Sequence, residues 1–377
     1  MSKVLFTAST YSHIVNFHRP YLAAFRQLGW RVEVACGGTP MEIPEAHRVV
    51  YIPFEKEMSS PRNIAAWRQL RRLMKEEEYD LVSCHTSLAS FFTRMAVRGL
   101  KNRPKVACTA HGYLFGEENS GAKNLLLSTA EGLAAPVTDL LMTMNRWDTG
   151  YANAHKLGKQ IVEVPGIGLD TDRLRPVSGQ ERAALRAEWG VAEEDILLLY
   201  AAEFSGRKSQ QVLIRAITHL PEQVKLALPG QGALREECMA LAAQLGVEER
   251  VLFPGQVQMA PWYGAADLAV SASRSEGLPF NIMEAMYYGL PVVASRVKGH
   301  TDLLEESGAG LLYPYGDWAA CAGCIQDLLL DRELTARMGE RGQQAVEAYT
   351  LERVLPAVMA QYGVLVPLGQ PASAEPV

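Results

Sequence analysis

Two glutamates in one short segment carry the strongest chemical signal in this sequence. Glu276 and Glu284 lie in the run SRSEGLPFNIMEAM, residues 273–286, which follows an apolar stretch at 268–271. The stretch is typical of a buried strand, and the run that follows it is predicted to open a helix. A helix start offers free N–H groups and a positive dipole end, which suit a phosphate, and a nearby carboxylate can accept hydrogen bonds from sugar hydroxyls. A capped helix with a surface glutamate explains the same residues equally well.

A pair of adjacent cations forms a second candidate site. Arg207 and Lys208 end the segment EFSGRK, which follows the predicted strand at 196–200. Fixed positive charge in such a strand-to-helix loop suits a diphosphate, whose negative charge grows when it leaves as a product. A solvated basic loop is the alternative. Gly232 and Val257 follow the next two predicted strands and are candidates for a nucleotide-base pocket.

Histidines follow two predicted strands in the first half of the chain. His111 comes after the strand at 106–109, and His13, Asn16 and His18 lie after the strand at 4–7 in what we expect to be a loop. Residues beyond the carboxyl ends of parallel strands are where ligands bind in open α/β sheets. The alternatives are a turn histidine at position 111 and a His18 that only caps the following helix.

Short apolar runs alternate with helical segments along the chain, which predicts βαβ units and parallel sheets. The predicted strands are 4–7, 31–36, 81–84, 106–109, 140–144, 161–164, 196–200, 224–228, 251–253, 268–271, 292–294 and 310–313. A Gly- and Pro-rich seam at 164–170 separates the two series. We therefore expect two α/β domains of similar size with a hinge near residue 170.

The longer string EGLPFNxxEAMxxGLPVVAS, from Glu276 to Ser295, resembles family 4 of the retaining glycosyltransferases. The resemblance covers nearly the whole chain, and SHIVNFHRP at 12–20 is most similar to the bacterial exopolysaccharide and capsule branch. It implies a GT-B fold, with two Rossmann-like doubly wound domains facing a cleft. The expected parts are an acceptor-side domain at 1–170, completed by a docked helix at about 346–368, a donor-binding domain at 171–345, and a loose tail at 369–377.

The resemblance also implies roles for individual residues. Glu284 is expected to bind the ribose hydroxyls, Glu276 the hydroxyls of the transferred sugar and Lys208 the diphosphate. Glu203 departs from the family pattern, because an arginine is usual at this position. Arg207 could supply the missing charge. The expected catalytic residues are Glu276, Lys208 and His111; the expected donor-binding residues are Glu284, Arg207, Gly277, Leu278, Phe280, Asn281, Ile282, Gly232 and Val257; the expected acceptor-side residues are His13, Asn16 and His18.

The implied activity is transfer of a sugar, suggested to be an N-acetylhexosamine, from a UDP-sugar to a lipid-linked or saccharide acceptor. No cofactor is expected, and no metal, because paired aspartates are missing from the strand-end loops. A nucleotide-sugar epimerase and a non-catalytic nucleotide-sugar-binding subunit remain as alternatives. A nicotinamide dehydrogenase is disfavoured, since no GxGxxG follows the first strand.

Composition limits the partners and the compartment. The chain has 37 Lys and Arg against 42 Asp and Glu, and a net charge of −5 weighs against a nucleic-acid binder. Six sparse cysteines and the lack of a signal-peptide pattern favour a cytoplasmic protein, with Cys321 and Cys324 as a pair on a helix face. Two basic stretches, 68–75 and 94–105, are either a docking surface for an anionic membrane or solvated faces.

Overall fold

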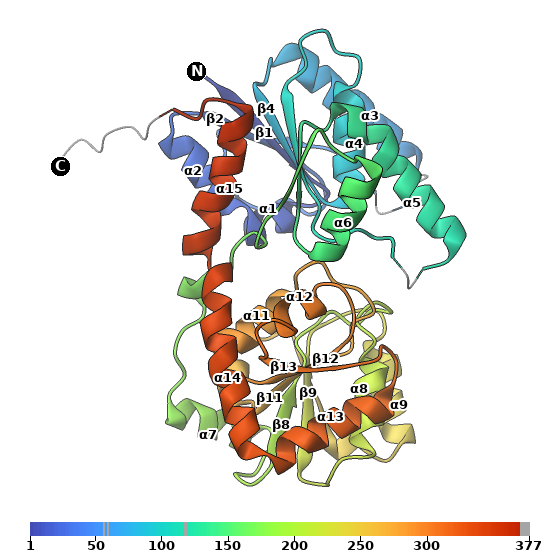
Figure 1. Cartoon of the computed structure of the whole chain (residues 1–377), viewed down its shortest axis with the longest axis vertical. Helices are drawn as coiled ribbons and strands as arrows, with labels where there is room; N and C mark the ends of the chain where they lie inside the picture. The colour runs from blue at the N-terminus through green and yellow to red at the C-terminus, as the bar shows by residue number, and fades with distance from the viewer. Residues whose placement is uncertain (56, 59, 117–118, 370–377) are drawn as a thin grey trace, which may run out of the picture. The chain divides into compact units, whose positions relative to one another are not determined.

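The computed structural model describes residues 1–55, 57–58, 60–116 and 119–369, so the expected tail lies outside the described residues except for Gly369. The chain forms two compact units, which Figure 1 shows. The amino-terminal unit comprises Met1–Gly168 and the chain from Glu352 onward, and the carboxyl-terminal unit comprises Leu169–Leu351. The prediction of two α/β domains is confirmed.

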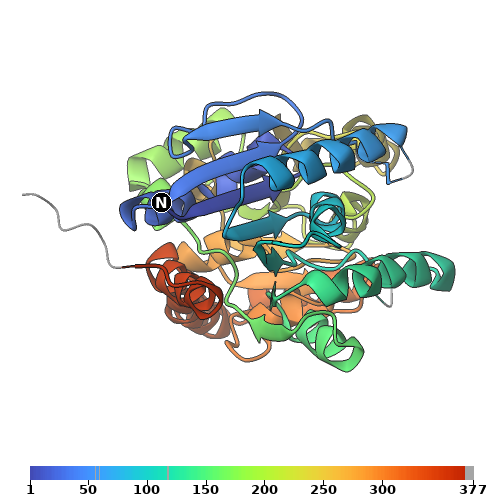
Figure 2. The same cartoon turned by 90° about the horizontal axis from the view of Figure 1, so that it is seen from above.

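The amino-terminal unit is built on a seven-stranded parallel sheet in the order β3-β2-β1-β4-β5-β6-β7. Figure 2 shows β1, β2 and β3 side by side in blue, with β3 at the end of the sheet. The strands are β1 (Lys3–Ala8), β2 (Arg31–Cys36), β3 (Arg48–Tyr51), β4 (Leu81–His85), β5 (Lys105–Thr109), β6 (Leu140–Thr143) and β7 (Gln160–Glu163). The helices are α1 (Tyr11–Phe17), α2 (Arg19–Gln27), α3 (Pro61–Glu76), α4 (Ser87–Val97), α5 (Gly121–Ala134) and α6 (Arg146–His155).

The final helix, α15 (Leu351–Leu365), returns to this unit, as expected from the sequence. Its Tyr362 hydroxyl lies 2.7 Å from Ser83 Oγ on β4, and the Tyr362 ring packs edge-on against Phe25 of α2 at 5.3 Å between centroids. Beyond the helix, the Leu368 carbonyl accepts a hydrogen bond of 3.0 Å from the Trp30 indole. These contacts hold the end of the chain against elements from its beginning.

The carboxyl-terminal unit is built on a six-stranded parallel sheet in the order β10-β9-β8-β11-β12-β13. Its strands are β8 (Ile196–Leu199), β9 (Val224–Pro229), β10 (Val251–Gly255), β11 (Leu268–Ser271), β12 (Val292–Ser295) and β13 (Gly310–Tyr313). Its helices are α7 (Gly179–Glu188), α8 (Gln210–Ile217), α9 (Arg235–Gln244), α10 (Met259–Ala265), α11 (Phe280–Tyr287), α12 (His300–Leu304), α13 (Trp318–Leu330) and α14 (Arg332–Val346). Cys321 and Cys324 both lie on α13 as free thiols.

Both sheets follow the doubly wound order, in which the chain reverses direction across the sheet at one strand pair. The reversal lies between β1 and β4 in the first sheet and between β8 and β11 in the second. Loops after these strands diverge at that point and leave room for a ligand. The topology therefore marks one place in each unit where functional side chains should gather.

Every strand predicted from the sequence is present, and the structure adds β3, which the sequence did not reveal. β3 is a four-residue edge strand whose side chains are partly exposed, so it lacks the apolar run that identifies a buried strand. The stretch with His13 and Asn16 was expected to be a loop, and that prediction was wrong. It forms α1, because the Thr10 hydroxyl caps it by accepting from the His13 N–H at 3.3 Å and because Tyr11 and Ile14 bury one face.

Candidate functional site

The reversal point of the second sheet brings the two strongest sequence candidates together. Arg207 and Lys208 lie in the loop after β8, and Glu276 lies in the loop after β11. Lys208 Nζ is 2.5 Å from Glu276 Oε1, and Arg207 Nη1 is 2.9 Å from Glu276 Oε2. Arg207 also donates to the Ser275 carbonyl at 3.1 Å. Both carboxylate oxygens of Glu276 are thus held by cations from the neighbouring strand's loop.

Burial gives this group its electrostatic character. The Glu276 side chain is 8% exposed and that of Lys208 is 12% exposed. Burial by itself would raise the pKa of Glu276, but Lys208 and Arg207 together lower it to about 2. Burial lowers the pKa of Lys208, against the opposing effect of Glu276. Two cations and one anion leave the trio with one net positive charge near a loop and a helix start.

Hydrogen bonds within the unit fix the two loops against each other. The Tyr200 hydroxyl donates to the Lys208 carbonyl at 3.0 Å and lies 2.8 Å from Ser273 Oγ. The Arg274 N–H donates to the Arg207 carbonyl at 2.7 Å. The cations therefore reach Glu276 from backbones that are tied together.

His300, at the start of α12, is buried beside this group. Its Nδ1 donates to the Ser295 carbonyl at 2.7 Å, and its Nε2 lies 3.2 Å from Ser271 Oγ. Burial lowers the pKa of His300 to about 4, so the ring is neutral near pH 7. The imidazole contributes shape and hydrogen bonds to the site, without a further charge.

Glu284 is held on α11 by a tyrosine. The Tyr263 hydroxyl of α10 donates to Glu284 Oε2 at 2.7 Å, and burial raises the pKa of Glu284. The Tyr263 ring stacks on Tyr288 with 5.4 Å between centroids. The hydrogen bond from Tyr263 therefore orients the Glu284 carboxylate in the absence of a ligand.

The stretch between the two glutamates presents backbone and apolar side chains. Leu278 and Ile282 are buried in the unit, and Gly277 is buried as well. Phe280 and Asn281 are half-buried at the first two positions of α11. Leu278 and Ile282 therefore contribute mainly to the packing of this segment within the unit.

Gly232 follows β9 and makes a close backbone contact within the protein. A Cβ at this position would lie 2.3 Å from the Phe204 carbonyl oxygen, and its φ is +152°. The glycine is therefore required by the loop after β8, a different reason from the base contact expected from the sequence. Val257 is half-buried after β10, and Glu203 is exposed, with its carbonyl accepting from the Gln210 side chain at 2.9 Å.

Four of the eight histidines gather at the reversal point of the first sheet. His13 and His18 come from α1 and its end, His85 ends β4, and His111 follows β5. His13 Nε2 lies 3.2 Å from His18 Nε2, and His85 Nδ1 lies 3.3 Å from His111 Nε2. The rings of His18 and His85 are 3.8 Å apart between centroids. His18 thus turns its ring to other histidines, and the capping role considered for it is not seen.

These histidines are held neutral. Burial lowers the pKa of His13 to about 4 and takes the pKa values of His18, His85 and His111 well below the ordinary value, with further lowering from the neighbouring imidazoles. Asn16 lies on the exposed side of α1. The structure therefore brings His13, His18 and His111 together, and it places Asn16 apart from their shared cluster.

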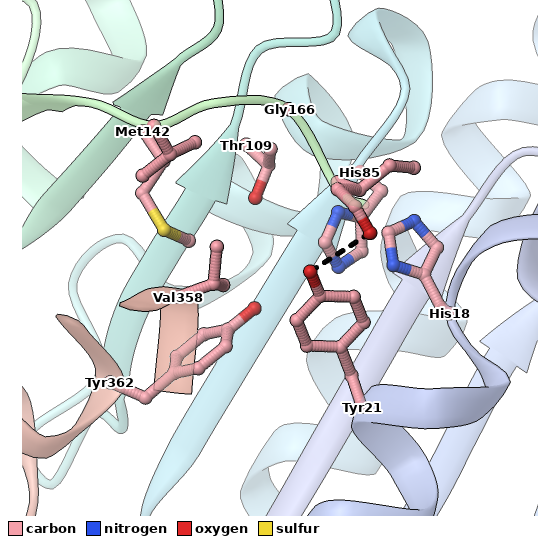
Figure 3. Close-up of a pocket in the computed structure, with 10 residues that line it drawn as sticks. His18, Tyr21, His85, Thr109, Met142, Gly166, Val358 and Tyr362 are labelled. Atoms are coloured by element: carbon pink, nitrogen blue, oxygen red, sulfur yellow. Dashed lines mark hydrogen bonds between the residues drawn. The ribbon is translucent and has the colours of Figure 1, made fainter. Parts of the chain in front are cut away.

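A small cavity is lined by residues that include His18 and His85, and Figure 3 shows the residues around it. Its volume is about 10 Å³, close to the ~10–15 Å³ that one water molecule needs. The lining residues are His18, Tyr21, His85, Thr109, Met142, Val164, Gly166, Ile167, Val358 and Tyr362. The Tyr21 hydroxyl donates to the Ile167 carbonyl at 3.0 Å, the dashed line in Figure 3. The cavity is too small for a sugar.

Several residues of these sites were not singled out by the sequence reasoning. His85, Tyr200, Tyr263 and His300 all reach the sites from elements next to the predicted candidates. His85 had a usable signal, because it ends a predicted strand next to the one that His111 follows. The sequence gives no such signal for the tyrosines, because a tyrosine in an apolar pattern is normally interpreted as a residue of the hydrophobic core.

Two cations of the basic stretch at 94–105 are paired within the amino-terminal unit. Arg94 is fully buried and pairs with Glu131 on α5 at 2.9 Å, and Arg103 pairs with Asp139 at 2.6 Å. Their charges are thus satisfied inside the unit. Within residues 1–55, 57–58, 60–116 and 119–369, no helix is both long enough and apolar enough to cross a membrane.

Comparisons with known proteins agree with the two-unit architecture. The model described as glycosyl transferases group 1 matches residues 181–345, and the model described as Glycosyltransferase Family 4 matches residues 21–201. EpsD of Bacillus subtilis (strain 168), whose name describes it as a glycosyltransferase, is 34% identical over 364 residues, 93% of this chain and 95% of that protein. The N-acetyl-alpha-D-glucosaminyl L-malate synthase of Bacillus anthracis is 25% identical over 82% of this chain and 81% of that protein.

Solved structures share the fold. The Anabaena protein Alr3699/HepE, crystallised with UDP and glucose, superposes with a TM-score of 0.81 at 21% identity, covering 97% of this chain and all of that one. WaaG, described as a glycosyltransferase involved in lipopolysaccharide biosynthesis, gives a TM-score of 0.73 at 21% identity and covers 97% of this chain and all of that one. At these identities, the likeness establishes the two Rossmann-like units.

Proposed function

Because this chain belongs to glycosyltransferase family 4 and has the GT-B fold, we propose that it moves a sugar from a UDP-sugar to a lipid-linked or saccharide acceptor, with retention of configuration, in bacterial polysaccharide assembly. One observation supports the assignment of the donor site. Glu276 is held by Lys208 and Arg207 where the second sheet reverses direction. The loops that carry this trio follow β8 and β11, the strand pair beside which doubly wound folds bind ligands, and this supports the proposal.

Lys208 and Arg207 are proposed to hold the donor diphosphate. The leaving nucleoside diphosphate gains negative charge as the glycosidic bond breaks, and fixed cations aimed at that charge lower the barrier. Lys208 is the stronger candidate because its side chain is 12% exposed against 44% for Arg207, so solvent screens its charge less. In this proposal side chains neutralise the diphosphate, and no metal ion is assigned there.

Glu276 is proposed to hold hydroxyls of the transferred sugar. A covalent nucleophile in retaining glycosidases works as one of two close carboxylates. Here both Glu276 oxygens already bind cations, and the low pKa marks a strongly stabilised carboxylate, which is a weak nucleophile. The arrangement supports front-face chemistry, in which the departing phosphate takes the proton of the acceptor hydroxyl, over a glycosyl-enzyme intermediate at Glu276.

Glu284 is proposed to bind the ribose hydroxyls of the donor. Tyr263 fixes the Glu284 carboxylate through Oε2, and the backbone of Gly277 to Ile282 lies between the two glutamates along the chain. The positive dipole end at the start of α11, which begins at Phe280, suits the sugar and diphosphate oxygens. Gly232 and Val257 remain our candidates for the base pocket.

The acceptor side is assigned to the amino-terminal unit. His13, Asn16 and His18 follow β1, and we propose that the exposed face of α1 contacts the acceptor. For His111, the proposed role is stabilisation of positive charge near the reacting carbon through its backbone carbonyl or a hydrogen bond to the sugar. No role as general base is assigned, because desolvation lowers the pKa of His111 and makes its imidazole a weak base.

Uridine diphosphate is the first nucleotide to test. The Anabaena protein of the same fold has been crystallised with UDP-glucose, and the Bacillus anthracis relative is named for an N-acetylglucosaminyl product. These names support a UDP donor and an N-acetylhexosamine as starting choices.

A non-catalytic nucleotide-sugar-binding subunit is the second candidate, because exposed Glu203 stands where the family usually has an arginine. Without the positive charge of that arginine, the site would bind a diphosphate more weakly.

The test combines nucleotide binding with product analysis. Calorimetry of the full chain with UDP, GDP, ADP and TDP should select UDP. Lys208→Ala and Glu284→Gln should each weaken UDP binding at least about tenfold, as expected for loss of a charged hydrogen bond. Arg337→Ala is the matched control, since it removes an exposed cation on α14 whose partner is Glu333.

The products then separate the alternatives. Sugar transfer only with acceptor present, and with the donor anomeric configuration kept, supports the proposal. Epimerised donor without acceptor would identify an epimerase. Binding without any turnover would favour the non-catalytic subunit, and equal binding by the Lys208 variant would refute the diphosphate assignment.

A further inference from the structure

We propose that the amino-terminal unit binds one divalent transition-metal ion of the zinc class through His13, His18 and His111. All three residues belong to the amino-terminal unit, whereas Glu276, Lys208 and Glu284 belong to the carboxyl-terminal unit. One ring nitrogen from each of the three histidines can be chosen so that all lie within 4.8 Å of one another. The inference does not depend on the identity of the sugar donor.

The spacing of the ring nitrogens is close to that of a metal centre. Zinc–nitrogen bonds of about 2.0–2.1 Å in a tetrahedral site place neighbouring nitrogens roughly 3.3 Å apart. His13 Nε2 and His18 Nε2 are 3.2 Å apart. The His111 nitrogen lies within 4.8 Å of the other two, so metal binding requires the three rings to draw closer together, and His13 and His111 are only half-buried.

The three imidazoles offer the kind of ligand atom that such a metal binds. A metal ion binds imidazole through a ring nitrogen that carries no hydrogen, and each of His13, His18 and His111 offers one ring nitrogen to the cluster. Neutral imidazole suits zinc, cobalt, nickel and copper, whereas magnesium and calcium prefer oxygen. When the metal binds, the hydrogen on one of the two Nε2 atoms moves through solvent to Nδ1 of the same ring, so that both rings stay neutral and bind through Nε2.

A second layer of contacts orients the cluster. His85 Nδ1 lies 3.3 Å from His111 Nε2, and His85 Nε2 lies 2.9 Å from Ser83 Oγ, which in turn lies 2.7 Å from the Tyr362 hydroxyl. Phe6 stacks on His85 with 5.6 Å between ring centroids. Histidine ligands are usually held by such outer hydrogen bonds, which set their tautomer. In this site His85 is a positioning residue.

Three histidine ligands predict a metal ion with an open coordination position. Three histidines are the protein ligands of open zinc sites, in which a fourth position is left for water or another oxygen. His18 is buried, while His13 and His111 are partly exposed, so the cluster is accessible to solvent from the side of His13 and His111. Of the two roles proposed for His111, charge stabilisation through the backbone carbonyl does not use the imidazole and is the one compatible with a bound metal.

Cobalt spectroscopy provides the test. The full chain, purified without a histidine tag and stripped with a chelator, is titrated with Co²⁺ and, by calorimetry, with Zn²⁺. We expect one ion per chain and visible d–d bands of a low-coordinate nitrogen site, without the thiolate charge-transfer band that the free cysteines would produce. His13→Ala and His111→Ala should weaken Co²⁺ binding at least about a hundredfold, and Tyr362→Phe about tenfold.

Matched variants keep the proposal falsifiable. His155→Ala removes an exposed histidine outside the cluster, and Cys324→Ser removes the half-buried thiol on α13; both should bind Co²⁺ like the native chain. Circular dichroism verifies that the His13 variant, at a half-buried position, is folded. Absence of Co²⁺ and Zn²⁺ binding by the native chain at micromolar concentration overturns the proposal, and so does native-like binding by the folded His13 and His111 variants.

Discussion

Replacing Glu276 by glutamine keeps the shape of a buried side chain and removes its charge. The pKa of Glu276 is about 2 in the folded chain against an ordinary value of 4.5, and the difference corresponds to a free energy on the order of 3 kcal/mol. Loss of one partner of a buried ion pair costs about 3–5 kcal/mol, because the other charge stays buried. Lys208 is that charge, with Arg207 contributing less because it is 44% exposed. We expect Glu276→Gln to lower the free energy of unfolding by about 3 kcal/mol at pH 7.

Urea unfolding followed by far-ultraviolet circular dichroism measures this change. If the two units unfold in separate steps, only the step of the carboxyl-terminal unit should move. Glu333→Gln is the matched control, because it removes the same charge from an exposed pair with Arg337 on α14 and should change stability by no more than about 0.5 kcal/mol. A double-mutant cycle with Lys208→Met isolates the coupling between the two side chains.

The pH dependence has a definite sign. The pKa of Glu276 is lower in the folded chain than in the unfolded chain, so its contribution is fully present above pH 4.5 and is lost as the pH falls toward about 2. The native chain should lose about 3 kcal/mol more than the glutamine variant across that window. A variant within about 0.5 kcal/mol of the native chain at pH 7, or a cycle without coupling, would refute the ion-pair argument.

Two further variants test the packing around the sites. Arg94→Leu should lower the free energy of unfolding by about 3–5 kcal/mol, because it leaves buried Glu131 without its cation; a loss below about 1 kcal/mol in urea unfolding would contradict this. Gly232→Ala should cost about 1–3 kcal/mol and lower the melting temperature, since its Cβ would meet the Phe204 carbonyl at 2.3 Å. Gly206→Ala, where no atom lies within 4 Å of the new Cβ, is the control, and equal melting temperatures for the two alanine variants would speak against the close approach.

Much of the fold could be predicted from local pattern. Buried parallel strands are apolar on both faces, so runs such as 4–7 and 81–84 are recognisable without any contact information. The edge strand β3 escaped this reasoning because half of its environment is solvent. For α1, the polar residues at 12–18 resembled a ligand-binding loop, and only the Thr10 cap and the packing of Tyr11 and Ile14 make them a helix.

The sequence indicated which residues are candidates for the site, but it did not indicate which of them contact each other. Glu276 and Lys208 were both identified as candidates for separate roles, yet the sequence contains nothing that says they touch. They are 68 positions apart, and they meet because β8 and β11 are neighbours in a sheet whose order is set by long-range pairing. Arg94 shows the reverse case, since a charge that read as surface is satisfied inside by Glu131.

The amino-acid sequence by itself determined the residue types at each strand end, the two α/β halves and the family. Only the tertiary structure decided which of those strand ends are adjacent. Local periodicity in the sequence indicates burial and secondary structure. The pKa of Glu276 and the clustering of the four histidines depend instead on distances between loops that are far apart along the chain. Those distances are set by the strand order of each sheet. Electrostatic interactions fall off with distance and depend on burial, so charge and chemistry are properties of the folded arrangement.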